Sequence, residues 1–224
     1  NGVIGMADVL RAEGLNDTQD GYAKTIQQSA KSLMRIIDDV LDFSKIEADR
    51  LELDVCATGL RPLVEDTVFS HVSVALEKRV DLSVFVAADC PHQVEADETR
   101  VRQIINNLVS NAIKFSASQS ESRGRVIVTV NREENNLRLD VLDNGIGMSA
   151  EACKTVFNSF TQAESDTTRR FGGTGLGLSI VKRLVEMMAG SIDVSSKPDV
   201  GTTFTVLLPF DEVGVSNEFD CNTF

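Results

Sequence analysis

The clearest hydrophobic pattern in the chain lies between residues 16 and 53. Its apolar residues alternate between spacings of four and three: Ile26, Ala30, Leu33, Ile37 and Val40. This alternation is typical of the buried seam of a helical bundle. A shorter apolar stripe in residues 1–11 predicts a second helix, and Asn16 or Asp17 is suited to the N-cap of the longer one. Two such helices cannot bury these faces alone, so the pattern favours a dimeric four-helix bundle.

Beyond residue 53 the pattern changes to strands interleaved with helices. Alternating or β-branched apolar runs predict strands at residues 51–57, 80–87, 124–133, 136–145, 191–196 and 202–209. Helical periodicity predicts helices at residues 60–78, 97–115 and 175–188. This mixed order predicts an α+β fold in which helices cover one face of a sheet.

Composition excludes several classes of protein. A formal net charge of −12 over 224 residues argues against a nucleic-acid-binding surface. No apolar run is long enough to span a bilayer, and no signal peptide is visible, so we expect no membrane contact by this segment. The cysteines are scattered without a CxxC pair, and only His71 and His92 are available beside them, which indicates reduced thiols rather than a zinc site. We therefore expect a cytoplasmic location.

Both ends of the chain suggest a piece of a longer protein. Asn1 already stands within a helical pattern, and residues 211–224 are polar and acidic without periodicity, like a linker. We expect further sequence on either side.

A glycine cluster stands at the entrance to the predicted helix at 175–188. In residues 170–180, RFGGTGLGLSI, four glycines fall within six positions. Glycine at a helix entrance allows close approach of a ligand, and the unpaired N–H groups there favour phosphate. The cluster lacks the lysine of a P-loop and the spacing of a dinucleotide-binding loop, so both of those interpretations fail.

Two polar motifs accompany the glycine cluster. Asn107, Asn111 and Lys114 share one face of the predicted helix at 97–115, where they would line a polar ligand site or form a solvated face. Asp143 ends an apolar strand in DNGIGM, where it would accept a hydrogen bond from an exocyclic amine or simply begin a turn.

Together these motifs resemble the catalytic ATP-binding domain of sensor histidine kinases, a branch of the GHKL ATPases. The motifs, in order, are Asn107-x-x-x-Asn111-x-x-Lys114-Phe115, Asp143-x-Gly145-x-Gly147, Phe157-x-x-Phe160 and Gly173-x-Gly175-x-Gly177. Residues 54–210 resemble that domain. Residues 1–53 are similar to the dimerisation and histidine-phosphotransfer domain of hybrid-type kinases, and residues 211–224 would be the linker. The resemblance implies a helical hairpin, half of a dimeric four-helix bundle, followed by a GHKL (Bergerat) two-layer α/β sandwich.

The resemblance also implies a role for each motif at the base of ATP. Asp143 would accept a hydrogen bond from the adenine amino group, supported by Thr202 through water. Gly145 and Gly147 would let the ring approach the backbone, and Phe115 would pack against the purine.

At the phosphates, the resemblance implies that Asn111 binds Mg²⁺, with Asn107 lining the same site, and that Lys114 binds phosphate. Arg169 and Arg170 would close over the triphosphate as a lid. The hinge of that lid and the helix entrance would comprise Gly173, Thr174, Gly175, Leu176 and Gly177. Phe157 and Phe160 would either dock the lid or pack in the core.

The implied reaction is transfer of the γ-phosphoryl group of ATP to a histidine, then relay to an aspartate of a receiver domain in cis or in trans. The acceptor of this family lies in a segment resembling H-E-x-R-T-P-L, just before NGVIGM, so we expect it upstream of Asn1. Neither His71 nor His92 fits that position. The resemblance further implies a homodimer, and a full-length protein that could be membrane-anchored.

Two alternatives remain open. A non-catalytic regulatory module would bind nucleotide without transferring phosphate. A chaperone- or topoisomerase-type ATPase would require a catalytic glutamate just before Asn107, and neither Gln103 nor Asn106 supplies one.

Overall fold

A computed structural model describes residues 2–48, 50–116, 123–159 and 175–211 of the chain. The chain divides into two compact units, Asn1–Leu51 and Glu52–Phe224. Among the described helices, none is both long enough and apolar enough to cross a bilayer.

The first unit is a helical hairpin of α1 (Gly2–Ala12) and α2 (Asp17–Glu47), which pack against each other. Asn16 is the N-cap of α2, and it exchanges hydrogen bonds with Gln19 in a capping box. The helix ends at Glu47, earlier than the sequence predicted. The Arg50 N–H instead bonds back to the Lys45 carbonyl, which closes the last turn.

Most of the predicted bundle seam faces outward in this single hairpin. Ile26, Leu33, Ile37 and Val40 expose between 43% and 57% of their surface. Within the hairpin, Ala7 and Ala23 are buried, and polar contacts join the two helices: Arg11 pairs with Asp20 at 2.7 Å, and Gln27 donates to Asp8.

The second unit is built on a five-stranded sheet with the order β2-β4-β5-β7-β6. Its strands are β2 (Val80–Val86), β4 (Gly124–Glu133), β5 (Asn136–Asp143), β7 (Gly201–Pro209) and β6 (Ser191–Lys197). The β2–β4 pair is parallel and the other pairs are antiparallel. A separate two-stranded sheet pairs β1 (Cys56–Gly59) with β3 (Gln93–Ala96).

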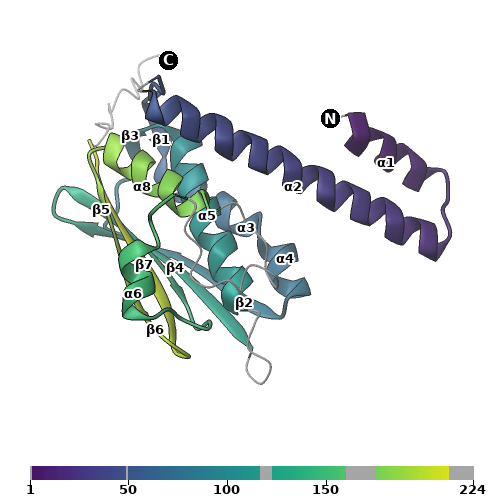
Figure 1. Cartoon of the computed structure of the whole chain (residues 1–224). Helices are drawn as coiled ribbons and strands as arrows, with labels where there is room; N and C mark the ends of the chain where they lie inside the picture. Colours follow the sequence, from purple (N-terminus) through teal and green to yellow (C-terminus); the bar gives the residue numbers. More distant parts are fainter. Residues whose placement is uncertain (1, 49, 117–122, 160–174, 212–224) are drawn as a thin grey trace, which may run out of the picture. The chain divides into compact units, whose positions relative to one another are not determined.

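Helices cover one face of the large sheet (Figure 1). They are α3 (Leu60–Phe69), α4 (Val72–Glu77), α5 (Glu98–Ser116) and α8 (Gly177–Met187). Helix α5 packs against α3, α8 and strands β4, β5 and β7, so it is the centre of the core. A short helix, α6 (Ala150–Thr155), contacts β6. The predicted α+β fold is confirmed.

The second unit departs from the predicted elements in four places. The expected helix at 60–78 breaks at Ser70, whose hydroxyl donates to the Thr67 carbonyl at 2.7 Å, while the His71 N–H bonds to Val68. Such side-chain bonds to the backbone compete with helix continuation. The expected strand at 51–57 is shorter, because only residues from Cys56 onward find a partner in β3. Strand β3 and helix α6 were not predicted.

Candidate functional site

Asp143 occupies a position of β5 at which the alternation of the strand predicts a buried apolar side chain. The preceding inward positions of β5, Leu137, Leu139 and Val141, are buried toward the helical layer, and Asp143 continues that series with 6% of its surface exposed. A buried carboxylate is costly unless hydrogen bonds hold it. Its placement therefore indicates a specific purpose.

Two backbone N–H groups hold the Asp143 carboxylate. Gly145 donates to Oδ1 at 2.8 Å, and Thr202, its partner across the β5–β7 ladder, donates through its own backbone N–H. Burial nevertheless dominates and raises the pKa of Asp143 from its ordinary 3.8 to about 6, while the two N–H groups act in the opposite direction.

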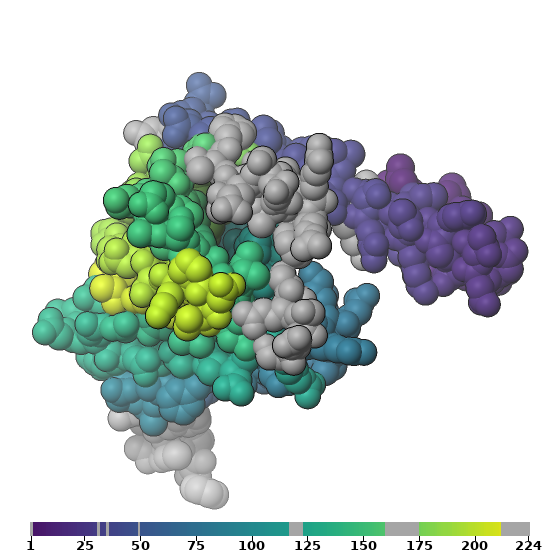
Figure 2. Space-filling model, turned by 60° about the horizontal axis from the view of Figure 1, so that its bottom comes forward, coloured from purple at the N-terminus to yellow at the C-terminus, as the bar shows by residue number. Residues whose placement is uncertain are grey.

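The glycines after Asp143 allow several backbones to meet. A Cβ on Gly145 would lie 2.8 Å from the carbonyl oxygen of Phe115, at the end of α5. Gly147 has a φ of +64°, and a Cβ there would lie 2.0 Å from the carbonyl oxygen of Lys197. Asp199 also donates its N–H to the Ile146 carbonyl at 2.8 Å. Figure 2 shows the resulting surface, where the yellow-green β6–β7 turn borders the green residues that follow β5.

Helix α5 contributes the polar face that the sequence predicted. Asn107, Asn111 and Lys114 are all half-buried and recur at spacings of four and three. The Lys114 Nζ lies 4.9 Å from the ring centre of Phe115. From Asn107 to Phe115 the helix rises roughly 12 Å. One end of this face therefore adjoins the Asp143 turn, and the other lies about two turns away.

The far end of that face meets the entrance of α8. A Cβ on Gly177, the first residue of α8, would lie 2.9 Å from Asn107 Oδ1. Gly175 has a φ of +69°, and Leu176 is buried in the core, where it anchors the start of the helix. Unpaired N–H groups at such a helix start favour an anion.

The structure thus brings together most of the predicted site residues. Asp143, Gly145, Gly147, Phe115 and Thr202 lie at one end of the α5 polar face. Asn107 and Gly177 meet at the other, and Leu176 and Gly175 precede Gly177.

Four predicted site residues, Arg169, Arg170, Gly173 and Thr174, lie outside the described residues. Phe160 does too. Phe157 packs edge-on against Phe204, with ring centres 6.1 Å apart, which favours the core-packing interpretation of that aromatic.

Sequence reasoning missed two polar residues of this region. Asn144 accepts a hydrogen bond from the Arg125 N–H at 2.6 Å and donates to the Arg123 carbonyl, which ties the end of β5 to the start of β4. Ser196 accepts a hydrogen bond from the Met148 N–H at 2.8 Å. Neither had a detectable local signal, since Asn144 reads as part of a turn and Ser196 as an ordinary strand residue.

A metal at this site would depend on few protein ligands. Among the residues that the structure describes, no group of three or more His, Cys, Asp or Glu side chains is arranged to hold an ion. Mg²⁺ commonly takes one or two protein oxygens and completes its shell with phosphate and water. The amide of Asn111, between Asn107 and Lys114 on the polar face, fits that mode.

Two family sequence models match the chain. The one described as histidine kinase-, DNA gyrase B-, and HSP90-like ATPase matches residues 96–212. The one described as His Kinase A (phospho-acceptor) domain matches residues 1–49.

Curated relatives agree with these matches. Sensor protein GacS of Pseudomonas syringae pv. syringae is 39% identical over 222 residues, which cover 99% of this chain and 24% of that protein. Hybrid signal transduction histidine kinase A of Dictyostelium discoideum is 38% identical, over 94% of this chain and 10% of that protein. Sensor histidine kinase RcsC of Escherichia coli K12 is 34% identical, over 93% and 21%. The chain thus spans about a quarter or less of these relatives.

Solved structures show the same architecture. Full-length ShkA in complex with AMPPNP has a TM-score of 0.77 and 30% identity, over 95% of this chain and 43% of that one. Histidine kinase ThkA in complex with response regulator protein TrrA has a TM-score of 0.65 and 22% identity, over 93% and 57%. At that identity the second likeness shows the fold alone.

The buried carboxyl of Asp143 has a measurable signature. Its raised pKa means that the folded state holds a proton more tightly than the unfolded state, so folding stability should fall as pH rises from about 4 through about 6 and then level off. Carbon-13 NMR of the side-chain carboxyl should show a titration midpoint near 6. Asp143→Asn should remove this part of the pH dependence of unfolding by denaturant. A midpoint near 4 would contradict the burial argument.

Proposed function

The chain belongs to the histidine kinase-, DNA gyrase B- and HSP90-like ATPases and carries the two domains of a sensor histidine kinase; from this premise we propose that it binds Mg-ATP and serves as a kinase core. The γ-phosphoryl group would pass to a histidine and then to a receiver aspartate. The observation that carries the proposal is the buried, backbone-held carboxylate of Asp143 at one end of the α5 polar face.

Asp143 would recognise the adenine amino group. The carboxylate already accepts from Gly145 and Thr202, and an ionised carboxylate retains lone pairs for another donor. A Cβ at Gly145 would lie 2.8 Å from Asp143 Oδ1, so glycine there leaves the carboxylate in its place, and Phe115 would pack on the ring at the end of α5. Thr202 would support the contact, directly or through water.

The phosphates would lie along the polar face of α5, from Lys114 toward Asn107. Asn111 would supply an oxygen to Mg²⁺, Asn107 would line the same site, and Lys114 would neutralise phosphate charge. The entrance of α8 at Gly177 would direct its N–H groups at the polyphosphate. When bound, Mg²⁺ supplies charge neutralisation on the phosphates. Arg169, Arg170, Gly173 and Thr174 remain a predicted lid and hinge.

Positioning and charge neutralisation carry most phosphoryl transfer, so the chain needs no elaborate set of acids and bases. The acceptor, however, is a separate matter. Residues 1–49, which match the phospho-acceptor domain, contain no histidine. His71 hydrogen-bonds to Asn106 at 2.8 Å, and His92 stands just before β3. We infer that neither is the acceptor and that the acceptor lies outside these 224 residues.

Dimerisation through α2 would explain its exposed apolar positions. Ile26, Leu33, Ile37 and Val40 stand at the spacing of a bundle seam, and a second copy would bury them. A receiver domain, in cis or in trans, would then take the phosphoryl group, as the hybrid character of relatives such as the Dictyostelium kinase suggests.

Asp143→Asn should weaken ATP binding about 10- to 100-fold, because the amide replaces a charged acceptor with a group that presents a donor. Calorimetric titration with Mg-ATP measures this. Asp193→Asn, on the exposed face of β6, is the matched control and should bind as the wild type does. An unchanged affinity in the Asp143 variant would refute the adenine assignment.

Asn111→Ala should abolish most of the gain in nucleotide affinity that Mg²⁺ provides, since the variant loses a metal ligand. Nucleotide titrations in the presence of Mg²⁺ and in the presence of EDTA give that gain as the ratio of the two affinities. Asn106→Ala removes an amide from the exposed side of the same helix and should leave the ratio intact. Equal ratios in both variants would exclude the metal role.

Incubation of the 224-residue chain with γ-labelled ATP should yield no acid-labile phosphohistidine. Extension of the chain upstream through the expected histidine should restore it. His71→Gln and His92→Gln are the controls, because each variant should show the same phosphorylation as the wild type. Label on either residue would overturn the acceptor assignment.

A further inference from the structure

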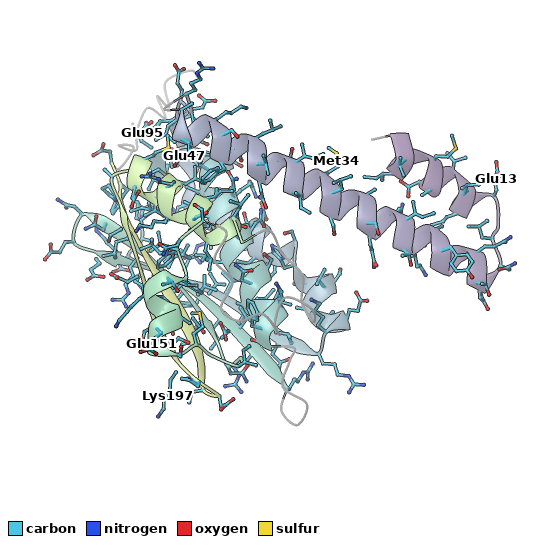
Figure 3. The ribbon with its side chains drawn as sticks, in the orientation of Figure 1. Glu13, Met34, Glu47, Glu95, Glu151 and Lys197 are labelled. Atoms are coloured by element: carbon cyan, nitrogen blue, oxygen red, sulfur yellow. The ribbon has the colours of Figure 1, made fainter. Side chains whose placement is uncertain are left out.

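The hydroxyl of Ser196 joins three parts of the candidate adenine site. Its oxygen accepts from the Met148 N–H at 2.8 Å, in the loop that follows Asp143. It lies 2.9 Å from the Gly201 carbonyl oxygen and 2.9 Å from Thr202 Oγ1, at the start of β7. The next residue, Lys197, is labelled in Figure 3 at the end of β6.

Hydrogen-bond valency allows a single arrangement of these contacts. A serine hydroxyl has one hydrogen, and a carbonyl oxygen can only accept. If Ser196 donated to Thr202, its oxygen would face the Gly201 carbonyl at 2.9 Å with no hydrogen between them. Ser196 must therefore donate to Gly201, and Thr202 must donate to Ser196.

This arrangement determines what Thr202 offers to a ligand. Its one hydroxyl hydrogen is committed to Ser196, so Oγ1 presents only lone pairs elsewhere. Thr202 lies opposite Asp143 in the β5–β7 ladder, and its backbone N–H holds the Asp143 carboxylate. The two polar side chains at this end of the site, Asp143 and Thr202, are therefore both hydrogen-bond acceptors.

We propose that Ser196 is a positioning residue that makes Thr202 a hydrogen-bond acceptor and thereby sets the preference for a 6-amino purine over a 6-oxo purine. This inference rests on the proposed binding of ATP. The amino group of adenine donates two hydrogens to the acceptors, directly or through one water. A 6-oxo purine presents a carbonyl oxygen at the same position, and two acceptors repel it. Without Ser196, the Thr202 hydroxyl can rotate and donate to that oxygen.

The experiment compares Mg-ATP with Mg-ITP, whose base carries a 6-oxo group, by calorimetric titration. Ser196→Ala should reduce the ratio of ATP affinity to ITP affinity by roughly three- to tenfold, the worth of about one hydrogen bond. Ser196→Cys keeps nearly the same volume, but its sulfur is a weak acceptor for the Thr202 hydroxyl, so it should reduce the ratio in the same direction. Ser195→Ala, on the exposed face of the same strand, is the matched control and should leave the ratio unchanged.

The outcomes separate the two levels of the proposal. If Ser196→Ala and Ser196→Cys weaken both nucleotides equally, Ser196 has a structural role alone and the inference fails. A wild type that binds ATP and ITP equally well also overturns it. A wild type that binds neither nucleotide refutes the proposed function itself. Circular dichroism of each variant verifies that the fold is retained.

Discussion

The burial of one face of α5 against the sheet is the constraint on which the rest of the structure depends. Ile104, Ile105, Leu108 and Val109 have no exposed surface, and the helix touches β4, β5 and β7 as well as two neighbouring helices. Successive residues of a helix are about 100° apart, so a shift of one residue would drive polar side chains into the core. Packing of the apolar face therefore fixes the direction in which the polar face, with Asn111 at its middle, points.

A second constraint works against stability. Asp143 stands where the alternation of β5 calls for an apolar side chain, and its pKa of about 6 records the cost of that burial. The cost is tolerated because backbone N–H groups reach the carboxylate, which requires a glycine at 145 and the close approach of β7. Gly201 provides that approach, since a Cβ there would lie 2.0 Å from the Asp143 carbonyl oxygen. Local violations of the folding pattern of this kind are expected where recognition takes precedence.

The two units of the chain differ in how they bury their apolar residues. The unit 52–224 has its own apolar core, and its polar site is held by the sheet register. The helical unit, by contrast, exposes the apolar positions of α2 whose spacing is typical of a bundle. In the proposed kinase core, the unit 52–224 would recognise the nucleotide, and the helical unit would form the dimer.

The sequence alone determined the features that depend on local periodicity. An N-cap at Asn16 or Asp17, the apolar and polar faces of α5 and the strands of the large sheet all followed from spacing within a few residues. The roles given to the site residues remain predictions. Only the tertiary structure decided the pairing of β1 with β3, the burial of Asp143 between backbones, and the bond from Met148 to Ser196, which are 48 positions apart. Such contacts join elements that are distant in the chain, and they arise from the packing of the whole domain, so no local pattern records them.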